Sequence, residues 1–268
     1  MAKPKIIGII PARYSSKRLP GKPLIRIEGK PLVQRVYEAV KRSRLLDRVI
    51  VATDSARISD VVYGFGGEAH LSLRRHPTGT DRVAEVVRNL NYDWVLNIQC
   101  DQPFLNPKMI DDLVASMFKE RNILMGTLAR KIEDPQELKN PNVVKVVMDQ
   151  KGFALYFSRF PIPYIRDMHL TVHPKGFDKI DLKRLDYYEH MGIYIFRKDF
   201  LLKFASWKET LLEKYEKLEQ LRALENGYKI KVCITEYQSP TIDSPADLQK
   251  LKIPPKPVFK RQNRGESR

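Results

Sequence analysis

The stretch KIIGIIPARYSSKRLPGKPL, residues Lys5–Leu24, decides the fold that this sequence predicts. Its opening run, KIIGII, is almost wholly apolar and of strand length, which is typical of a strand buried on both faces of a parallel sheet. The run ends abruptly in a loop rich in proline, glycine, arginine and lysine. We therefore expect a buried parallel strand that feeds a functional loop.

The residues after this loop predict a helix and a second buried strand. PLVQRVYEAVKRSRLLD places apolar residues at near-helical spacing, and DRVIVATD follows as a second apolar run. Strand, loop, helix and strand in this order make a βαβ unit, whose two strands run parallel. The same alternation continues through PKMIDDLVASMFKE. The sequence therefore predicts an α/β fold with a doubly wound, mostly parallel sheet.

The second half of the chain adds further strands. From about Gly126 the β-rich pieces TLARKI, VVKVVMD and FALYFSR are separated by turn signals. A polar segment, Asp167–Tyr188, precedes the strand HMGIYIF, and a long helix is expected from about Glu209 to Asn226. The strand KIKVCITE and the closing TIDSPADLQKL follow. We expect extra strands beside the parallel sheet.

The composition is typical of a folded domain. Hydrophobic residues make up 43% and charged residues 30% of the 268 residues, so a sizeable core can form. The two cysteines, Cys100 and Cys233, make no metal-type spacing, and no apolar run approaches the roughly 20 residues that span a bilayer. We therefore expect a cytoplasmic protein with two free thiols and no membrane partner.

The net charge of +16 leaves open a second class, a nucleic-acid-binding protein. Part of this charge lies in residues 252–268, a proline-broken basic stretch that we expect to be a disordered tail. No motif interleaves basic residues with aromatic stacking positions, as a nucleic-acid-binding module would. Nucleic acid is therefore the less favoured partner.

Four cations in the first loop predict an anion site. Arg13, Lys17, Arg18 and Lys22 share a stiff loop and would repel one another unless an anion lay among them. The loop contains neither GxxxxGK[ST] nor GxGxxG. A solvated basic loop is the alternative, but the place directly after a buried strand favours phosphate binding.

Two acids close strand-like segments elsewhere. Asp101 lies in NIQCDQPFL, directly after an apolar run, and Asp243 lies in PTIDSPADL. In open α/β sheets, ligands bind beyond the carboxyl ends of the parallel strands. Two carboxylates beside a phosphate site would supply oxygen ligands for Mg²⁺. Helix capping is the competing interpretation of Asp243, and the residues alone leave it open.

Three further signals are weaker. HPTGTDRVAEVV places Gly79 and Thr80 at a helix start, where backbone groups can bind an anion or wrap a base, although Thr80 is equally explained as an N-cap. The acids of LLEKYEKLEQLRALENG favour a solvated helix face. His190, beside an apolar strand, is by itself better explained as a structural histidine. No Ser/His/Asp or Cys/His relay can be assembled.

Taken in order along the chain, these motifs resemble the 3-deoxy-D-manno-octulosonate cytidylyltransferase family. The resemblance runs from about Lys5 to Leu251 and rests on IIPARYSSKRLPGKPL, ATDS, HPTGTDRVAEV, NIQCDQP, ALYFSRFPIPY, HMGIYIFRKDFL, EKLEQLRALENG and TIDSPADL. It implies a nucleotidyltransferase of the glycosyltransferase-A-like α/β type, usually a homodimer. Such an enzyme joins CTP to the sugar acid Kdo with Mg²⁺, giving pyrophosphate and CMP-Kdo for the inner core of lipopolysaccharide.

The resemblance also implies roles for single residues and regions. One domain would span residues 1–251, with about 126–195 as a lid, dimerisation and sugar-binding portion, ahead of the tail at 252–268. The residues implied for nucleotide binding are Pro11, Ala12, Arg13, Arg18, Lys22, Thr78, Gly79, Arg82 and Gln99. Those implied for sugar binding are Arg159, His190, Tyr194, Glu219 and Gln220. The implied metal ligands are Asp101 and Asp243, and the implied catalytic set is Arg13, Lys22, Asp101 and Asp243.

The chain departs from the family at one motif. Where the family usually reads GDEP this chain reads CDQP, so Cys100 stands in place of a glycine and Gln102 in place of an acid. The cysteine adds a side chain where backbone and nucleotide can approach closely, and the glutamine removes a charge near the metal. Both metal acids remain, so we expect activity with altered affinity or sugar choice. The nearest alternative substrate is a related sugar acid, 8-amino-Kdo or another 3-deoxy-2-keto sugar acid.

Overall fold

The computed structural model describes residues 3–15, 19–72, 74, 76–120, 122–166, 182, 186–242 and 244–250. Arg18, Asp243, most of the polar segment Asp167–Tyr188 and the basic stretch 252–268 lie outside these ranges. Among the described residues, no helix has both the length and the apolar character needed to cross a membrane.

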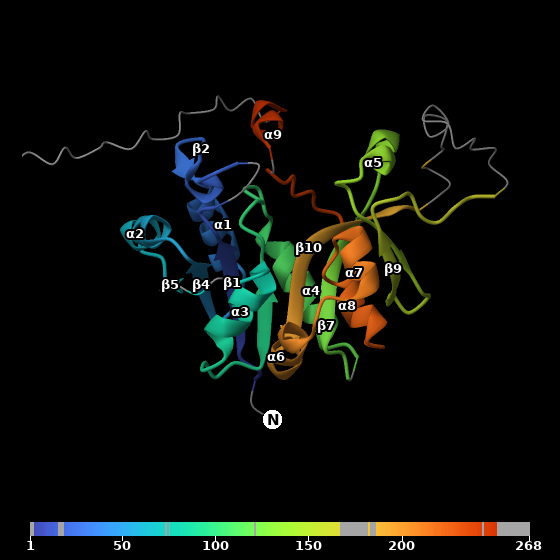
Figure 1. Ribbon diagram of the computed structural model, residues 1–268, viewed down its shortest axis with the longest axis horizontal. Coiled ribbons are helices and arrows are strands. Elements are labelled where there is room, and N and C mark those ends of the chain that lie inside the picture. Colours follow the sequence, from blue (N-terminus) through green and yellow to red (C-terminus); the bar gives the residue numbers. More distant parts are fainter. Residues whose placement is uncertain are drawn as a thin grey trace, which may run out of the picture.

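Among the residues that the structure describes, a nine-stranded sheet forms the centre of the fold. Figure 1 shows this sheet with helices packed around it. Its main path has the order β11-β7-β10-β6-β1-β4-β5, and β8 joins beside β10 with β9 as its outer neighbour. A two-stranded ribbon, β2 and β3, stands apart. The strands are Ile6–Ala12 (β1), Arg26–Ile27 (β2), Lys30–Pro31 (β3), Arg48–Thr53 (β4), Ala69–Leu71 (β5), Trp94–Asn97 (β6), Met125–Lys131 (β7), Lys145–Met148 (β8), Ala154–Ser158 (β9), Tyr188–Arg197 (β10) and Lys231–Thr235 (β11).

Most of the main path is parallel, which confirms the predicted fold class. β1 pairs in parallel with β4 and β6, β4 with β5, and β7 with β11. β10 runs antiparallel between β6 and β7, and β8 and β9 are the expected extra strands, which also pair antiparallel. The strand order reverses beside β1, so the carboxyl ends of β1, β4 and β6 flank the crevice in which such sheets bind ligands.

Helices cover both faces of this sheet, as the alternating pattern requires. One face packs against α1, α2 and α4 through residues such as Val36 and Leu113. The opposite face packs against α3, α6 and α8 through residues such as Val83 and Phe204. The helices are Lys22–Leu24 (η1), Leu32–Lys41 (α1), Ala56–Gly64 (α2), Gly79–Val87 (α3), Pro107–Met117 (α4), Pro135–Lys139 (α5), Lys198–Ser206 (α6), Leu211–Glu216 (α7), Leu221–Glu225 (α8) and Pro245–Lys250 (α9).

The single long helix predicted from about Glu209 to Asn226 is wrong. The segment forms two short helices, α7 and α8, because Lys217 adopts the left-handed conformation with φ 53° and ψ 46° and ends α7. The turn that follows buries Leu218 in the core. The same turn places Glu219 and Gln220 in the lining of a cavity that is described below.

Candidate active site

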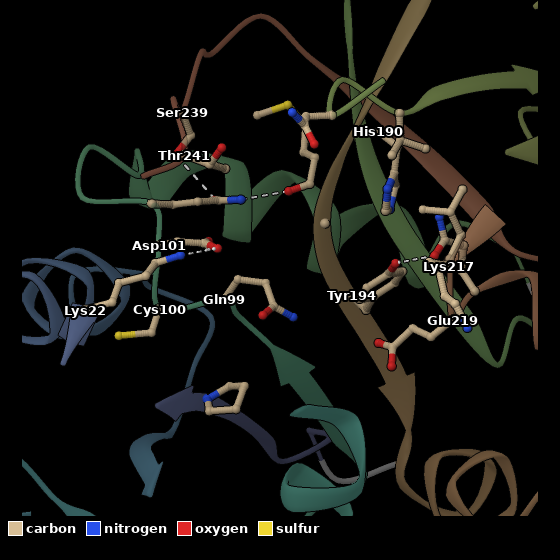
Figure 2. A pocket seen from close by; sticks show the side chains of 18 of the residues that line it. Lys22, Gln99, Cys100, Asp101, His190, Tyr194, Lys217, Glu219, Ser239 and Thr241 are labelled. Carbon is tan, nitrogen blue, oxygen red and sulfur yellow. Dashed lines mark hydrogen bonds and ion pairs between the residues drawn. The ribbon is translucent and has the colours of Figure 1, made fainter. Parts of the chain in front are cut away.

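Two cavities adjoin at the carboxyl ends of β1 and β6. The first, of about 780 Å³, lies between the loops after these strands and β10. The second, of about 490 Å³, lies between β1, the start of α3 and α7, and shares Pro11, Arg13, Gln99, Lys217 and Glu219 with the first. Figure 2 shows Lys22 and Asp101 on one side of the first cavity and His190, Tyr194 and Glu219 on the other.

Every predicted site residue that the structure describes lines one of these cavities. The first is lined by Pro11, Ala12, Arg13, Lys22, Gln99, Asp101, Arg159, His190, Tyr194, Glu219 and Gln220. The second adds Thr78, Gly79 and Arg82. Arg18 and Asp243 lie outside the described residues. Residues from distant parts of the chain thus converge on one region.

A charged pair lies on the side of the first cavity that is formed by the loops after β1 and β6. Lys22 Nζ lies 3.1 Å from Asp101 Oδ2, and the two side chains are 14% and 20% exposed. Gly21 shapes the loop that carries Lys22. Its φ of 69° lies in the left-handed region that glycine adopts without strain, and its N–H donates to the carbonyl of Tyr14. Lys22 and Asp101 are therefore held together at the ends of β1 and β6.

The C-terminal segment reaches the same point. The N–H of Ile242 donates to the carbonyl of Asp101 at 2.9 Å. Asp243 follows directly in the chain but lies outside the described residues. Among those that are described, no group of three or more His, Cys, Asp or Glu could hold a metal ion. Mg²⁺ binds through one or two carboxylates with phosphate oxygens and water, so the carboxylate of Asp101 fits as one of its ligands.

The two residues that depart from the family pattern are both buried. Cys100 packs in the apolar core, its sulfur turned away from the opposite wall of the cavity (Figure 2), and burial raises the pKa of its thiol to about 12. Gln102 is 1% exposed and donates through Nε2 to the carbonyl of Met191 at 2.7 Å. Its Oε1 accepts from the Ser239 hydroxyl at 3.3 Å. Gln102 therefore joins the β6 loop to β10 and to the C-terminal segment.

The start of α3 forms one wall of the second cavity. Thr78, rather than Thr80, is the N-cap, and it exchanges capping-box hydrogen bonds with Asp81. A Cβ added at Gly79 would lie 3.4 Å from Pro11, so the helix start approaches the end of β1 closely. Both observations place backbone of the helix N-terminus at the cavity, where it can meet a polar or anionic ligand.

Arg82 faces the second cavity from α3 and is 5% exposed. Its Nη2 donates to Asp54 Oδ2 at 2.8 Å, while its Nη1 is buried with no hydrogen-bond partner among the described residues. Asp54 also accepts from the N–H of Tyr14 at 3.3 Å. In the sequence, ATDS was noted as one of the motifs of the family resemblance, and Asp54 was assigned no role. Its position after β4 was the available signal.

On the opposite side, β10 and the turn between α7 and α8 present polar groups. The Tyr194 hydroxyl donates to Gln220 Oε1 at 2.9 Å, and burial raises the pKa of Tyr194 well above its ordinary value. His190 Nε2 lies 2.9 Å from Thr127 Oγ1, and burial lowers the pKa of His190 to about 3. His190 is therefore neutral at neutral pH, and can exchange hydrogen bonds but not supply charge.

Arg159 lines the first cavity, and three of its five N–H groups donate to backbone carbonyls. Nε, Nη1 and Nη2 donate to the carbonyls of Glu216, Pro141 and Lys217 at 2.6, 2.8 and 3.3 Å. The Glu216 carboxylate in turn accepts from the N–H of Arg159 at 2.9 Å. Arg159 therefore ties β9 to the end of α7, directly before the turn that carries Glu219.

The acids of α7 and the following turn do not form the solvated face that was expected. Glu213 makes a buried pair with Arg222, 2.5 Å between Oε1 and Nη2, with both side chains 6% exposed. Glu219 accepts from the Thr80 hydroxyl. The expectation was wrong because α7 ends at Lys217 and α8 packs against it, which brings Arg222 to Glu213.

A buried lysine was also missed. Lys145 is fully buried, and its Nζ donates to the carbonyls of Asn140, Val143 and Arg159 at 3.2, 2.7 and 2.7 Å. Burial lowers the pKa of Lys145 to about 8. In the sequence it interrupts the apolar strand VVKVV, and that interruption was the only signal.

Cavities at the point where the strand order reverses, a basic loop after β1 and the start of α3 are together typical of a nucleotide-binding α/β protein. A family model described as Cytidylyltransferase matches residues 7–230. The chain is a nucleotidyltransferase. It is 48% identical over 247 residues to the 3-deoxy-manno-octulosonate cytidylyltransferase of Geotalea uraniireducens (strain Rf4), which covers 92% of this chain and 97% of that one. It is 47% identical over 246 residues to the 3-deoxy-manno-octulosonate cytidylyltransferase of Geobacter sulfurreducens (strain ATCC 51573 / DSM 12127 / PCA), a match that covers 92% of this chain and 97% of that one. The chain belongs to the 3-deoxy-manno-octulosonate cytidylyltransferase family.

Solved structures agree with this assignment. The structure of a CMP:2-keto-3-deoxy-manno-octonic acid synthetase complexed with CTP is 37% identical, with a TM-score of 0.83 and coverage of 92% of this chain and 97% of that one. The 4-diphosphocytidyl-2C-methyl-D-erythritol synthase of Anaerococcus prevotii DSM 20548 is 16% identical, with a TM-score of 0.56 and coverage of 92% and 96%. At that identity it shares the fold alone.

Proposed function

We propose that this chain joins CTP to the sugar acid Kdo and releases pyrophosphate, giving CMP-Kdo for the inner core of lipopolysaccharide. The observation that carries the proposal is the convergence of the family's motifs, from β1, α3, β6, β10 and the turn after α7, on two adjoining cavities. The relatives named above act, by their names, on 3-deoxy-manno-octulosonate.

The nucleotide is placed in the part of the site built by β1 and α3. Arg13 and Lys22 would hold the triphosphate together with Arg18, because cations on a stiff loop match its charge. Pro11, Ala12 and Gln99 line the first cavity. With the helix start at Thr78 and Gly79, and the buried Nη1 of Arg82, they would frame cytidine.

The sugar acid is placed against β10 and the turn that follows α7. Glu219, Gln220 and Tyr194 offer hydrogen bonds to sugar hydroxyls, and neutral His190 offers one more. Arg159 is the cation on this side, and three of its five N–H groups donate to backbone carbonyls, which leaves two for the sugar carboxylate. We propose that Arg159 serves both purposes.

The reaction is an in-line displacement at the α-phosphorus. The anomeric hydroxyl oxygen of the sugar bonds to phosphorus, the bond to the β-phosphate oxygen breaks, pyrophosphate leaves with the electron pair, and the hydroxyl proton passes to solvent. Arg13 and Lys22 stabilise the charge that grows on pyrophosphate. The protein's main contribution is to hold the two substrates in line.

Mg²⁺ is part of the proposal. Asp101 and Asp243 would hold it, and the fit rests on the carboxylate of Asp101 at the ends of β1 and β6 and on the backbone bond that joins Ile242 to Asp101. Bound there, Mg²⁺ would supply positive charge that lowers the pKa of the attacking hydroxyl. Lys22, now paired with Asp101, would turn to the phosphates.

We also propose that the protein works as a homodimer in the cytoplasm. The exposed apolar residues Leu155, Phe160 and Tyr164 lie on and after β9, and β9 pairs with β8 alone among the described strands. An open strand edge with exposed apolar side chains is typical of a surface that another chain covers. Light scattering on the purified protein tests this oligomeric state.

The function is tested by pyrophosphate release from purified protein with CTP and Mg²⁺, across Kdo, 8-amino-Kdo and sialic acid. We expect release with Kdo and its loss in Asp101→Ala. The matched control is Asp60→Ala, an exposed acid on α2, which should match the wild type. No release with any 3-deoxy keto sugar acid would overturn the enzyme assignment, and a preference for another sugar acid would overturn only the choice of Kdo.

A further inference from the structure

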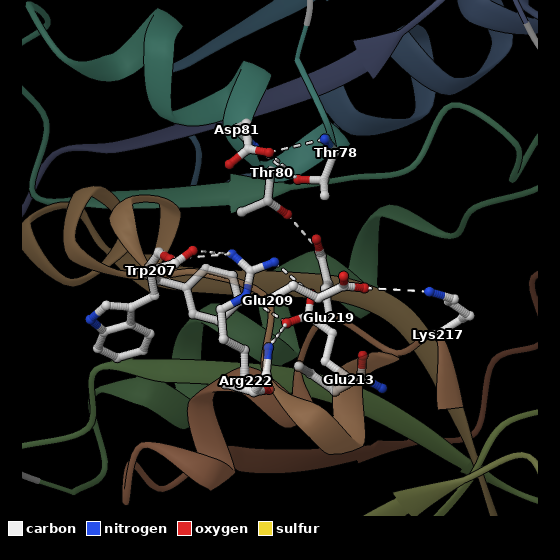
Figure 3. Close-up of polar contacts among 12 residues, drawn as sticks. Thr78, Thr80, Asp81, Trp207, Glu209, Glu213, Lys217, Glu219 and Arg222 are labelled. Carbon is white, nitrogen blue, oxygen red and sulfur yellow. Dashed lines mark hydrogen bonds and ion pairs between the residues drawn. The ribbon is translucent and has the colours of Figure 1, made fainter. Parts of the chain in front are cut away.

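Glu219 occupies a special position, because it lines both cavities. Its Oε1 accepts from the Thr80 hydroxyl at 2.5 Å (Figure 3). Thr80 is 1% exposed and lies in the first turn of α3, directly after Gly79. The contact therefore joins the helix that walls the second cavity to the turn between α7 and α8, across a long stretch of sequence.

Asn97, a residue of the central sheet, determines the direction of the hydrogen bond between Thr80 and Glu219. Asn97, fully buried at the end of β6, donates through Nδ2 to Thr80 Oγ1 at 2.9 Å. A hydroxyl has a single hydrogen, so once its oxygen accepts from Asn97 that hydrogen is available to Glu219. Asn97, Thr80 and Glu219 thus form a chain of donors that ends on a carboxylate.

The same pair of strands holds the next residue. Asn97 is the register partner of Tyr194 on β10, and the Tyr194 hydroxyl donates to Gln220 Oε1. Two neighbouring strand residues therefore hold two consecutive residues of the turn, one directly and the other through Thr80. Lys217 ends α7 just before this turn, so these side-chain bonds fix the turn together with backbone bonds such as that from the N–H of Leu221 to the carbonyl of Leu218.

The bond also affects the charge of Glu219. Burial raises the pKa of Glu219, and the hydrogen bond from Thr80 is the largest opposing effect, ahead of the charge of Arg222. Without the hydroxyl, the carboxyl group would lose its orienting donor and would hold its proton more readily. Both changes would weaken its use as a hydrogen-bond acceptor toward a sugar hydroxyl.

We infer that Thr80 and Asn97 are positioning residues for the sugar acid, which they serve by orienting Glu219 at the junction of the two cavities. The inference rests on the proposed function. Neither residue need touch the substrate, so their effect should fall on the sugar acid more than on CTP.

The test uses steady-state kinetics of Thr80→Val and Thr80→Ser, with thermal unfolding of each variant to confirm a folded protein. Valine keeps the shape and removes the hydroxyl, and we expect it to raise the KM for Kdo about tenfold, as loss of a hydrogen bond to a charged group would, while the KM for CTP changes less. Serine keeps the donor and should restore the wild-type value. Thr235→Val, a buried threonine of β11 outside both cavities, is the matched control and should leave both constants unchanged.

Asn97→Asp gives a second, independent arm. A carboxylate at position 97 accepts the Thr80 hydrogen and turns a lone pair of Oγ1 toward Glu219, so we expect at least the loss seen in Thr80→Val. Asn97→Ala leaves the hydroxyl free to donate and should cost less. If wild-type protein uses Kdo but Thr80→Val matches it, or if both KM values rise alike without rescue by serine, the inference fails. If wild-type protein uses no sugar acid, it is the proposed function that fails.

Discussion

Gln102→Glu inserts the acid that the family usually carries and should destabilise this protein. Gln102 is 1% exposed, and its Nε2 donates to the carbonyl of Met191 at 2.7 Å. A carboxylate cannot donate, so two oxygens would face each other in a buried place. Leaving a buried acceptor unsatisfied costs about 2–3 kcal/mol, and more where a charge is added. For a chain of this size that corresponds to a fall in Tm of roughly 4–12 °C.

The loss of stability in Gln102→Glu should also depend on pH. Burial should hold the pKa of the new carboxyl group above its value in the unfolded chain, and the protonated acid can donate to Met191 as the amide does. The Gln102→Glu protein is then most stable below the pKa that this carboxyl group has in the unfolded chain. That stability is lost as the pH rises through the pKa of the same group in the folded protein. The Tm deficit of Gln102→Glu relative to wild type should therefore be larger at pH 8 than at pH 5.

The assay is thermal unfolding of wild type, Gln102→Glu and Gln102→Met at both pH values. Methionine has a similar length, cannot form either hydrogen bond and does not titrate, so its deficit should not depend on pH. A Gln102→Glu protein as stable as wild type at pH 8 would contradict the role assigned to the amide of Gln102. A deficit equal to that of Gln102→Met at both pH values would contradict the expected titration of the new carboxyl group.

Three further predictions concern buried titratable groups. Because burial lowers the pKa of His190 to about 3, its stabilising contribution is present near neutral pH and is lost on acidification, so wild type should lose more stability between pH 7 and pH 4.5 than His190→Gln does. Burial raises the pKa of the Cys100 thiol to about 12, so a thiol reagent at pH 8 should leave Cys100 unmodified in folded protein and label two thiols per chain in denaturant. The pKa of Lys145, lowered to about 8, means that wild type gains stability relative to Lys145→Met as the pH rises from 8 to 10, measured by urea unfolding. Equal losses of stability in wild type and His190→Gln, labelling of Cys100 in folded protein, or no gain relative to Lys145→Met would each contradict the corresponding burial argument.

Much of the fold and of the site could be predicted because the signals were local. KIIGII followed by a basic loop predicted β1, and Arg13 and Lys22 of that loop line the first cavity. The apolar run before Asp101 likewise predicted β6, beyond whose carboxyl end Asp101 lies. The N-cap of α3 was placed at Thr80, although the capping-box spacing of Thr78 and Asp81 was a local signal for Thr78.

What could not be predicted depends on contacts between distant residues. Nothing in EKYEKLEQ, which lacks glycine and proline, signals that Lys217 adopts a left-handed conformation. The pairing of Glu213 with Arg222 and the bond from Thr80 to Glu219 form only once that break has occurred. Gln102 was expected to alter charge near a metal, whereas its amide joins three segments of the fold.

The most direct test of the account follows the α-phosphorus of CTP. Purified protein is incubated with Mg²⁺, Kdo and CTP labelled at the α-phosphate, and the products are separated and counted. The account predicts that the label appears in CMP-Kdo, with one unlabelled pyrophosphate released for each labelled product, and that Asp101→Ala abolishes both. Intact CTP, or labelled CMP and phosphate formed without transfer to the sugar acid, would contradict it.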